Sequence, residues 1–187
     1  LSIANQLHNL FPELRIIVLE KESEVGVHSS GRHSGVLHAG IYYKPKTVKA
    51  SVCVKGARRL TNWIEERNLP LNRCGKVIVA QKEHLDKQLD TLKERAEQNG
   101  AAVEIINEDR LSEIISCAKS SSGRALWSPN TSVTKPKVVM NYLGKELVQK
   151  GIEILFSEEI SSVMANEKKI ETKSGLSICY GYLFNCA

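Results

Sequence analysis

The sequence is poor in the residue patterns on which disulfide scaffolds and metal centres depend. Its five cysteines are an odd number, and no two of them form a C-x-x-C pair. The five histidines show no metal-ligand spacing with the cysteines, whereas a structural zinc site needs ligands clustered at such spacings. We therefore expect a reducing compartment and no metal ligands.

Long apolar runs and concentrated charge are also missing. No run approaches the roughly 20 apolar residues needed to cross a bilayer, and residues 1–10 lack the basic leader of a signal peptide. The net charge of +5 comes from 26 basic and 21 acidic residues. The densest basic stretch, residues 44–59, follows a helical pattern, which favours a solvated helix face over a nucleic-acid surface. We expect neither a membrane-spanning segment nor a nucleic-acid partner.

Short apolar runs alternate with amphipathic patterns along the chain, and this alternation predicts an α/β fold with a parallel sheet. The glycine- and serine-rich residues 26–40 show no periodicity and predict a loop. Residues 160–178 predict antiparallel strands with tight turns, and residues 182–187 have a strand pattern. Further strands are predicted at 15–20, 76–80, 103–106, 124–128 and 152–156, and helices at 1–10, 48–64, 85–96, 107–115 and 134–151. Asn99 and Gly100 are expected to end the third of these helices, Asn107 to cap the start of the fourth, and Pro136 to lie in the first turn of the fifth.

Glu20 ends the first predicted strand. In a dinucleotide-binding unit, an acid about 20 residues beyond the glycine turn binds a ribose hydroxyl. Counting back from Glu20 places that turn at or just before Leu1, so we expect the glycine turn immediately upstream of this sequence. The alternative is an ordinary glutamate at a strand end, paired with Lys21.

The segment HSSGRHSGVLHAGIYYKP, residues 28–45, contains two Ser-Gly pairs and three histidines. Glycines let backbone N–H groups approach a phosphate or a flat ring closely, and serine hydroxyls add donors. A flexible surface loop is the alternative interpretation. The apolar run VLHAGIYY within the segment favours the interpretation that the segment is functional.

The runs LEKE, GVHSSGRHSGVLHAGIYYKP, VKASVCVKGARRL, CGKVIVA and LFNCA resemble the L-2-hydroxyglutarate oxidase/dehydrogenase family, which belongs to the D-amino-acid-oxidase-like group of FAD enzymes. The resemblance extends over essentially all of the chain and is densest in the first 80 residues. The sequence departs from the family's usual pattern at Arg32-His33, Lys46 and Thr134.

The resemblance implies a Rossmann-like FAD-binding domain with an inserted portion. Residues 1–73 and 134–187 are expected to form the FAD-binding domain, and residues 74–133 the mixed α+β part of a substrate domain. The implied FAD contacts run from the adenosine to the flavin: Glu20 and Lys21 at the adenosine, the Ile160 backbone at the adenine, Ser30 and Gly31 at the pyrophosphate, His33, Ser34 and Gly35 along the ribityl chain, and Cys186-Ala187 leading into a further glycine.

By the same resemblance, His38 is expected nearest the flavin ring. An imidazole there can accept the substrate hydroxyl proton, because its pKa lies near the working pH. Two other roles stay open for His38: a covalent attachment point for the flavin, or a group that only hydrogen-bonds the flavin or the backbone.

The implied reaction is oxidation of a 2-hydroxy acid, in particular L-2-hydroxyglutarate to 2-oxoglutarate, by hydride transfer to flavin N5. Electrons would then pass to a quinone-linked acceptor or to oxygen. The alternatives are an FAD-dependent amine or glycerol-3-phosphate oxidoreductase, and a non-catalytic α/β nucleotide-binding module. The expected location is the cytoplasm or the inner-membrane periphery in a bacterium, through residues outside this chain, and the mitochondrion in a eukaryote. This stretch alone is expected to bind FAD weakly and to be inactive.

Overall fold

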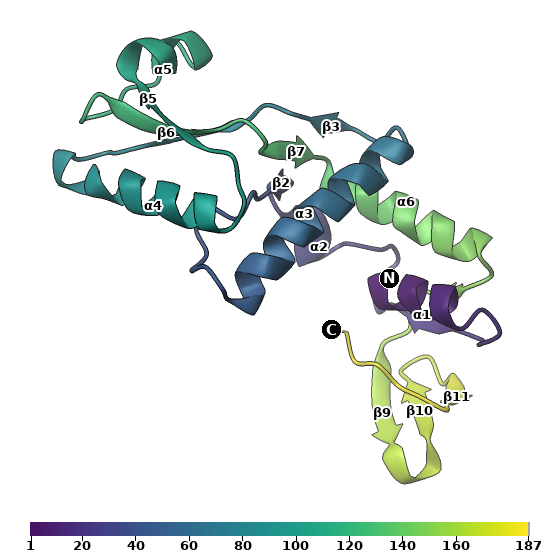
Figure 1. Ribbon diagram of the computed structural model, residues 1–187. Helices are drawn as coiled ribbons and strands as arrows, with labels where there is room; N and C mark the ends of the chain where they lie inside the picture. The colour runs from purple at the N-terminus through teal and green to yellow at the C-terminus, as the bar shows by residue number, and fades with distance from the viewer. Residues whose placement is uncertain (187) are drawn as a thin grey trace. The chain divides into compact units, whose positions relative to one another are not determined.

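The computed structural model describes residues 1–186 (Figure 1). Contacts divide them into two compact units. Unit 1 consists of Leu1–His33 and the chain from Pro136 onward, and unit 2 consists of Ser34–Lys135.

Unit 1 is built on a pair of parallel strands. Strand β1 (Ile17–Leu19) pairs with β8 (Glu153–Leu155), so that Ile17 lies opposite Glu153. Helix α1 (Ser2–Leu10) precedes β1, and α6 (Pro136–Gln149) precedes β8. Pro136 is the first residue of α6, as predicted, because proline lacks only an N–H that has no partner in the first turn. The predicted α/β class with a parallel pair is confirmed.

The core of unit 1 joins both helices to this strand pair. Ala4 of α1, Leu147 of α6 and Ile152 are buried together, and Val18 and Ile154 of the two strands contact them. Burial of such side chains stabilises a fold by roughly 1.5–3 kcal/mol each. The core therefore holds the carboxyl ends of β1 and β8 side by side.

Three antiparallel strands follow β8 in unit 1, as predicted. They are β9 (Ile160–Met164), β10 (Lys169–Thr172) and β11 (Ser177–Cys179). The strand predicted at residues 182–187 is wrong for residues 182–186, and Ala187 lies outside the described residues. A strand needs a hydrogen-bonded neighbour, and none of the described strands pairs with these residues, of which Tyr182 is 85% exposed.

A short helix, α2 (Ser29–Arg32), lies inside the segment predicted to be a loop. A Cβ atom at Gly31 would overlap the carbonyl oxygen of Gly26, so only glycine allows this close turn of the chain. The Cβ and Cγ of Met140, on α6, lie close to Gly26 as well. One helical turn is too short to produce a periodic pattern, and this is why the sequence did not indicate it.

Unit 2 contains a small antiparallel sheet that the sequence did not predict. Its strands are β2 (Val36–Leu37), β7 (Ser132–Thr134) and β3 (Leu71–Asn72), with β7 in the centre. Because β2 and β3 pair with β7, the chain from Ser34 to Arg73 packs within unit 2. The contact units divide after His33 and after Lys135, whereas the predicted domain boundaries lie after Arg73 and after Val133.

The larger sheet of unit 2 agrees with the prediction. Strand β6 (Arg124–Ser128) lies between β4 (Lys76–Val79) and β5 (Glu104–Asn107), and both pairings are antiparallel. The Asn107 side chain accepts a hydrogen bond from the Arg110 amide and caps the next helix, as its sequence position predicted. The helices of unit 2 are α3 (Val48–Glu66), α4 (Lys87–Gln98) and α5 (Glu108–Ile114).

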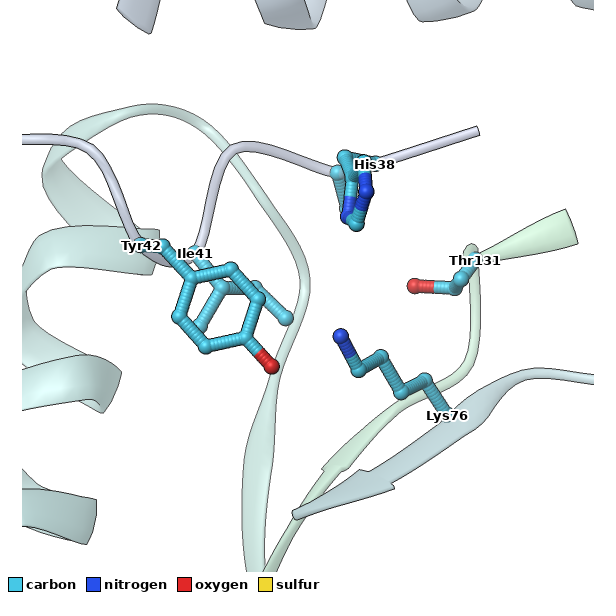
Figure 2. A pocket seen from close by; sticks show the side chains of 6 residues that line it. His38, Ile41, Tyr42, Lys76 and Thr131 are labelled. Atoms are coloured by element: carbon cyan, nitrogen blue, oxygen red, sulfur yellow. The ribbon is translucent and has the colours of Figure 1, made fainter. Parts of the chain in front are cut away.

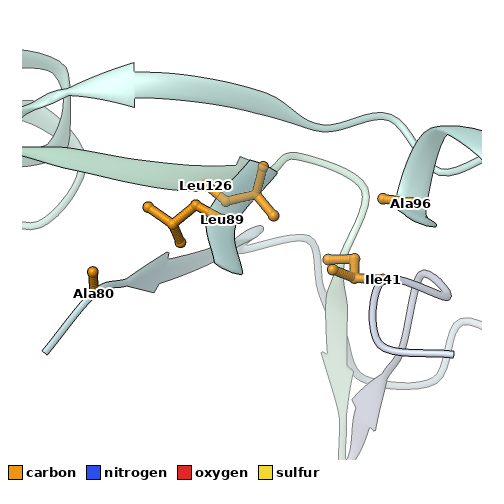
Figure 3. Close-up of a cluster of buried hydrophobic side chains, with 5 residues drawn as sticks. All are labelled: Ile41, Ala80, Leu89, Ala96 and Leu126. Atoms are coloured by element: carbon orange, nitrogen blue, oxygen red, sulfur yellow. The ribbon is translucent and has the colours of Figure 1, made fainter. Parts of the chain in front are cut away.

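The main core of unit 2 joins α4 to this sheet and to the loop after β2. Its fully buried members are Ile41, Ala80, Leu89, Ala96 and Leu126 (Figure 3). Ile41 comes from the loop, so the loop is anchored in the core. Within residues 1–186, no helix has both the length and the apolar character needed to cross a bilayer.

Candidate cofactor and active site

Glu20 directly follows β1 in unit 1. Its backbone amide donates to the carbonyl oxygen of Leu155 at 2.9 Å and so extends the pairing with β8. Its side-chain Oε1 accepts a hydrogen bond from the Glu22 amide at 3.0 Å. Ligands of open parallel sheets bind outside the carboxyl ends of the strands. Glu20 therefore lies at the sheet edge where a ligand of such a sheet would bind, and its side chain closes its own turn.

The turn after β8 is bonded to the turn after β1. The Ser157 amide donates to the Glu22 carbonyl at 3.0 Å, and the Glu158 amide donates to the Glu20 carbonyl at 2.9 Å. Ile160 begins β9 two residues further on and is 41% exposed. The structure thus brings two predicted adenosine-binding positions, Glu20 and Ile160, to one edge of unit 1, while Lys21 is exposed in the turn.

The predicted pyrophosphate residues lie on α2, which is tied to the same turn. His28, the residue before α2, contacts Glu22 through Nε2 at 2.7 Å from Oε1. Ser30 is exposed on the helix, and Gly31 makes the close approach to Gly26 described above. The edge of unit 1 is therefore a connected set of turns from Glu20 to Gly31.

The predicted ribityl residues are divided between the units. His33 is exposed at the end of α2 and belongs to unit 1. Ser34 and Gly35 begin unit 2, where Gly35 is buried with φ +74°, and its carbonyl accepts a hydrogen bond from the Thr134 amide at 3.0 Å. Glycine adopts such a positive φ without steric strain, whereas residues with a side chain do so rarely. The backbone conformation therefore explains why residue 35 is a glycine.

His38 lies in unit 2 beside a hollow with an empty volume of about 160 Å³. Figure 2 shows the His38 imidazole, the Lys76 ammonium and the Thr131 hydroxyl pointing toward a common space, with the Tyr42 ring at its side. Ligand pockets usually measure roughly 300–1,000 Å³. Much of this space is open to solvent and none of it admits a water-sized sphere, so the hollow is a narrow gap between side chains.

Three separate strands position the polar groups of the hollow. His38 follows β2, Lys76 begins β4, and Thr131 precedes β7. The Gly75 amide donates to the Thr131 carbonyl at 2.9 Å and so joins the starts of β4 and β7. Any side chain at Gly75 would overlap the ring of Trp127, so this close contact requires glycine.

The electrostatics of the hollow favour a neutral His38. His38 is only partly shielded from solvent. This partial burial lowers the pKa of His38 below its ordinary value, and the nearby Lys76 ammonium lowers that pKa further. The Lys76 Nζ lies 4.4 Å from the centre of the Tyr42 ring, a cation–π contact. A neutral imidazole in this position is able to accept a proton.

The loop that carries His38 is held by side chains from two helices. The Cys53 thiol of α3 donates to the His38 carbonyl at 3.3 Å. The side-chain amide of Asn99, at the end of α4, donates to the carbonyls of Gly40 at 2.8 Å and Tyr43 at 2.9 Å. These contacts preorganise the loop on both sides of Tyr42.

Lys76, Thr131 and Asn99 were not predicted to belong to the site. The pattern around Lys76 indicated only a strand, and Asn99 was interpreted only as a helix end. Their proximity to the His38 loop depends on tertiary contacts, and no local pattern in the sequence signals it.

Solved structures of several enzymes have a similar fold. Glycine oxidase from Geobacillus kaustophilus matches 95% of this chain and 49% of its own, with a TM-score of 0.83 and 15% identity. L-alpha-glycerophosphate oxidase from Mycoplasma pneumoniae, with FAD bound, matches 86% of this chain and 43% of its own, with a TM-score of 0.77 and 19% identity. At such identities the likeness shows the fold alone, which is of the α/β class.

The profile of the family described as FAD dependent oxidoreductase (DAO) matches residues 1–187, and the chain belongs to this family. Its cofactor is FAD. The chain is 36% identical to mitochondrial L-2-hydroxyglutarate dehydrogenase of Caenorhabditis briggsae over 89% of its length, and 31% identical to L-2-hydroxyglutarate dehydrogenase of Escherichia coli K12 over 100%. It spans about two fifths of these relatives, 38% and 44%. The predicted family and the predicted likeness to these dehydrogenases are confirmed.

The edge of unit 1 has chemistry that suits the adenosine end of FAD. Among the described residues, the one hydrogen-bond donor to the Glu20 carboxylate is the Glu22 amide. An ionised carboxylate has about four lone-pair sites, so Glu20 keeps acceptor capacity for ribose hydroxyls. The exposed Ser30 hydroxyl adds a donor on the same connected set of turns.

Proposed function

We propose that the full-length protein oxidises L-2-hydroxyglutarate to 2-oxoglutarate. The observation that carries this proposal is the identity of 30–36% to relatives named L-2-hydroxyglutarate dehydrogenase, from bacteria, a slime mould and animals. Bound FAD would supply the acceptor for the hydride from C2 of the substrate, at flavin N5. Because the chain spans about two fifths of these relatives, the proposal concerns the whole protein.

The proposed FAD contacts are those of the sequence prediction. In unit 1, Glu20 accepts hydrogen bonds from the ribose hydroxyls, and Lys21 lies beside it. This proposal is supported by the position of Glu20 at the carboxyl end of a parallel strand. The remaining proposed contacts are the backbone of Ile160 at the adenine, Ser30 and Gly31 at the pyrophosphate, and His33, Ser34 and Gly35 along the ribityl chain.

We assign His38 the role of general base. As the C2 hydride leaves the substrate, the hydroxyl proton passes to the imidazole, and the C2–O bond becomes the carbonyl of 2-oxoglutarate. A base must be neutral to act, and partial burial together with the Lys76 charge lowers the pKa of His38, which favours the neutral imidazole. Covalent attachment of flavin to His38, or hydrogen bonding alone, remain distinguishable by the histidine variant described in the Discussion.

The relatives are named dehydrogenases, which supports an electron acceptor other than oxygen; we propose a quinone-linked one. The names of the animal relatives place them in the mitochondrion. Another relative comes from the bacterium E. coli. We accordingly propose a mitochondrial location in a eukaryote, and a cytoplasmic or peripheral inner-membrane location in a bacterium.

The test is anaerobic reduction of the purified full-length protein, which should be yellow with bound FAD. L-2-hydroxyglutarate should bleach the flavin absorbance, and glycerol 3-phosphate and sarcosine should not. Bleaching by either of the latter compounds alone would assign the protein to a different substrate class. A colourless protein that takes up no added FAD would instead support a non-catalytic nucleotide-binding module.

A further inference from the structure

Helix α3 and the loop before it form a basic surface of unit 2. The sequence contains no acidic residue between Glu24 and Glu65. The Thr47 hydroxyl donates to the Lys44 carbonyl at 2.7 Å and accepts a hydrogen bond from the Ala50 amide at 3.2 Å, so the loop is held against the first turn of the helix. Six exposed basic residues of the loop and the helix make up what we call the basic face: Lys44, Lys46, Lys49, Lys55, Arg58 and Arg59.

The basic face is not neutralised by acidic side chains. Elsewhere in the described part of the chain, Lys137 and Lys173 lie 2.7 Å from a glutamate oxygen. Among residues 1–186, none of the six residues of the basic face forms an ion pair with a carboxylate. Lys49 contacts the Tyr43 ring instead, with 5.0 Å between its Nζ and the ring centre. Like charges on adjacent turns of a helix repel one another, so a partner with negative charge would stabilise this surface.

Two exposed valines lie within the basic face. Val48 is 80% exposed, and Val52 is 62% exposed. Residues four and seven positions apart share one side of a helix, so both valines lie on the same side of α3 as Lys55 and Arg59. The opposite side carries the buried residues of α3, such as Ile64. The side that faces solvent therefore combines unpaired cations with exposed apolar side chains.

This combination fits an anionic phospholipid membrane better than a nucleic acid or an acidic peptide. Nucleic-acid surfaces interleave basic residues with aromatic ones that stack on bases, whereas the exposed apolar residues of the basic face are valines. An acidic peptide would satisfy the cations and leave the valines in water. Lipid headgroup phosphates attract lysine and arginine, and the boundary between headgroups and acyl chains takes up exposed apolar side chains.

We propose that the basic face of α3 binds the surface of an anionic phospholipid membrane. Its lysines and arginines contact headgroup phosphates, and Val48 and Val52 enter the boundary with the acyl chains. This inference rests on the proposed function for its choice of partner, because quinones are apolar and dissolve in the bilayer. Membrane binding then brings the reduced flavoprotein to the phase that holds its electron acceptor.

The experiment measures how the full-length FAD-bound protein sediments with vesicles. One set contains phosphatidylglycerol and phosphatidylcholine in equal parts, and the other contains phosphatidylcholine alone. The test variant removes three cations of the basic face together: Lys55→Gln, Arg58→Gln and Arg59→Gln. The control variant makes the same change in net charge at exposed positions of unit 2 outside the basic face: Lys82→Gln, Lys87→Gln and Lys119→Gln.

Each basic residue near an anionic surface strengthens binding by roughly fivefold, so the test variant should bind the anionic vesicles on the order of 100-fold more weakly than the wild type. The control variant should bind them like the wild type, and none of the three proteins should sediment with phosphatidylcholine alone. Binding should also weaken as the salt concentration rises. Equal binding by the test and control variants, or no binding by the wild type, would overturn the inference.

Val52→Ser tests the apolar contact, and Val148→Ser, at a 57% exposed position of α6, is its matched control. Val52→Ser should bind the anionic vesicles about 3- to 10-fold more weakly, whereas Val148→Ser should bind like the wild type. Equal binding by both variants would contradict the insertion of Val52. A wild type that binds polyglutamate or duplex DNA but no vesicles would assign the basic face to that class of partner and overturn the membrane proposal.

Lysine acetylation read by mass spectrometry tests whether the basic face is open in the full-length protein. Lys55 should react in the absence of vesicles and be protected by anionic vesicles, while Lys119 should react in both conditions. A Lys55 that is unreactive without vesicles would show that another part of the protein covers the basic face, and this result would overturn the inference.

Vesicle binding needs no turnover, so its outcome is separate from that of the proposed function. If the wild type binds anionic vesicles and L-2-hydroxyglutarate does not bleach its flavin, the proposed function fails and the membrane surface is supported. If the flavin is bleached and the vesicles are not bound, the membrane inference alone fails.

Discussion

The side-chain amide of Asn99 donates a hydrogen bond to the carbonyl oxygen of Gly40 at 2.8 Å, across 59 positions of sequence. The same amide nitrogen donates to Tyr43 at 2.9 Å. Both of its hydrogens are therefore used to hold the loop that carries His38 and Tyr42. Gly40 itself has φ +95°, and a Cβ there would lie 2.6 Å from Val54 Cγ2, so the loop meets α3 closely on its other side.

Asn99→Asp should destabilise the protein and impair the His38 loop. A carboxylate cannot donate, so the Gly40 and Tyr43 carbonyls would face a negative charge in place of two N–H groups. A buried acceptor left unsatisfied costs about 1–3 kcal/mol, which should lower the thermal unfolding midpoint by several degrees and reduce kcat. Asn68→Asp is the matched control, because Asn68 is exposed just after α3 and adds the same charge near a helix end. Equal midpoints for both variants would contradict the role of Asn99.

His38→Ala should slow reduction of the flavin by about 10²- to 10⁴-fold, the usual contribution of a general base. The FAD content after gel filtration should stay close to that of the wild type, since the proposed cofactor contacts lie elsewhere. Stopped-flow absorbance under anaerobic conditions measures the rate of flavin reduction directly. An unchanged reduction rate would exclude His38 as the general base. Yellow colour that stays with the denatured wild type but leaves denatured His38→Ala would identify His38 as the covalent attachment point.

Removing the Lys76 charge should shift the acid limb of the pH–rate profile to higher pH. His38 acts as a base only when neutral, so kcat/KM falls as pH drops through the pKa of His38. The Lys76 ammonium disfavours protonated His38 and lowers the pKa of His38. Lys76→Met should therefore raise this pKa and move the acid limb to higher pH. The other titratable groups close to His38 are Tyr42, whose ring lies edge-on at 6.4 Å, and the Cys53 thiol. Cys53→Ala should leave the limb in place, whereas an unmoved limb in Lys76→Met would refute the coupling.

Features that depend on neighbouring residues could be predicted from the sequence. Asn107 caps α5, Pro136 begins α6, and Gly100 follows α4 with φ +78°, each as its local pattern indicated. Such features follow from backbone chemistry within one or two turns of the chain. The strands β2 and β3 have two residues each, too few to show alternation, so they escaped prediction.

The same distinction between local sequence and tertiary contacts applies to the residues of the candidate site. His38 and Glu20 were predicted because a motif or a strand end marks them. Lys76 and Thr131 approach His38 only through the pairing of β2 with β7 and the hydrogen bond between Gly75 and Thr131. These are contacts between segments distant in sequence, and their pairing is set by packing, which no single segment encodes.

Gly31→Ala should destabilise the protein, although it adds only one methyl group. The new Cβ would overlap the Gly26 carbonyl oxygen, so the backbone of α2 must shift. Such overpacking costs about 1–3 kcal/mol, and FAD retention should fall with it. Gly56→Ala is the matched control: Gly56 lies inside α3 with no atom within 4 Å of the new Cβ, so it should stabilise by up to about 1 kcal/mol. Thermal unfolding of both variants measures the contrast, and similar shifts in one direction would refute the steric argument.

Glu20→Gln should weaken FAD binding while leaving the fold intact. The glutamine carbonyl can still accept the hydrogen bond from the Glu22 amide, so the turn after β1 should persist. A neutral acceptor binds ribose hydroxyls less strongly than a carboxylate does, because charge-assisted hydrogen bonds are about twice as strong. We expect about tenfold weaker FAD binding, equivalent to about 1.4 kcal/mol, measured by titrating FAD into the apoprotein and following flavin fluorescence. Glu13→Gln, at an exposed position before β1, should bind FAD like the wild type. If Glu20→Gln also matches the wild type, Glu20 serves only to close its own turn, and the adenosine end of FAD must be held by other residues.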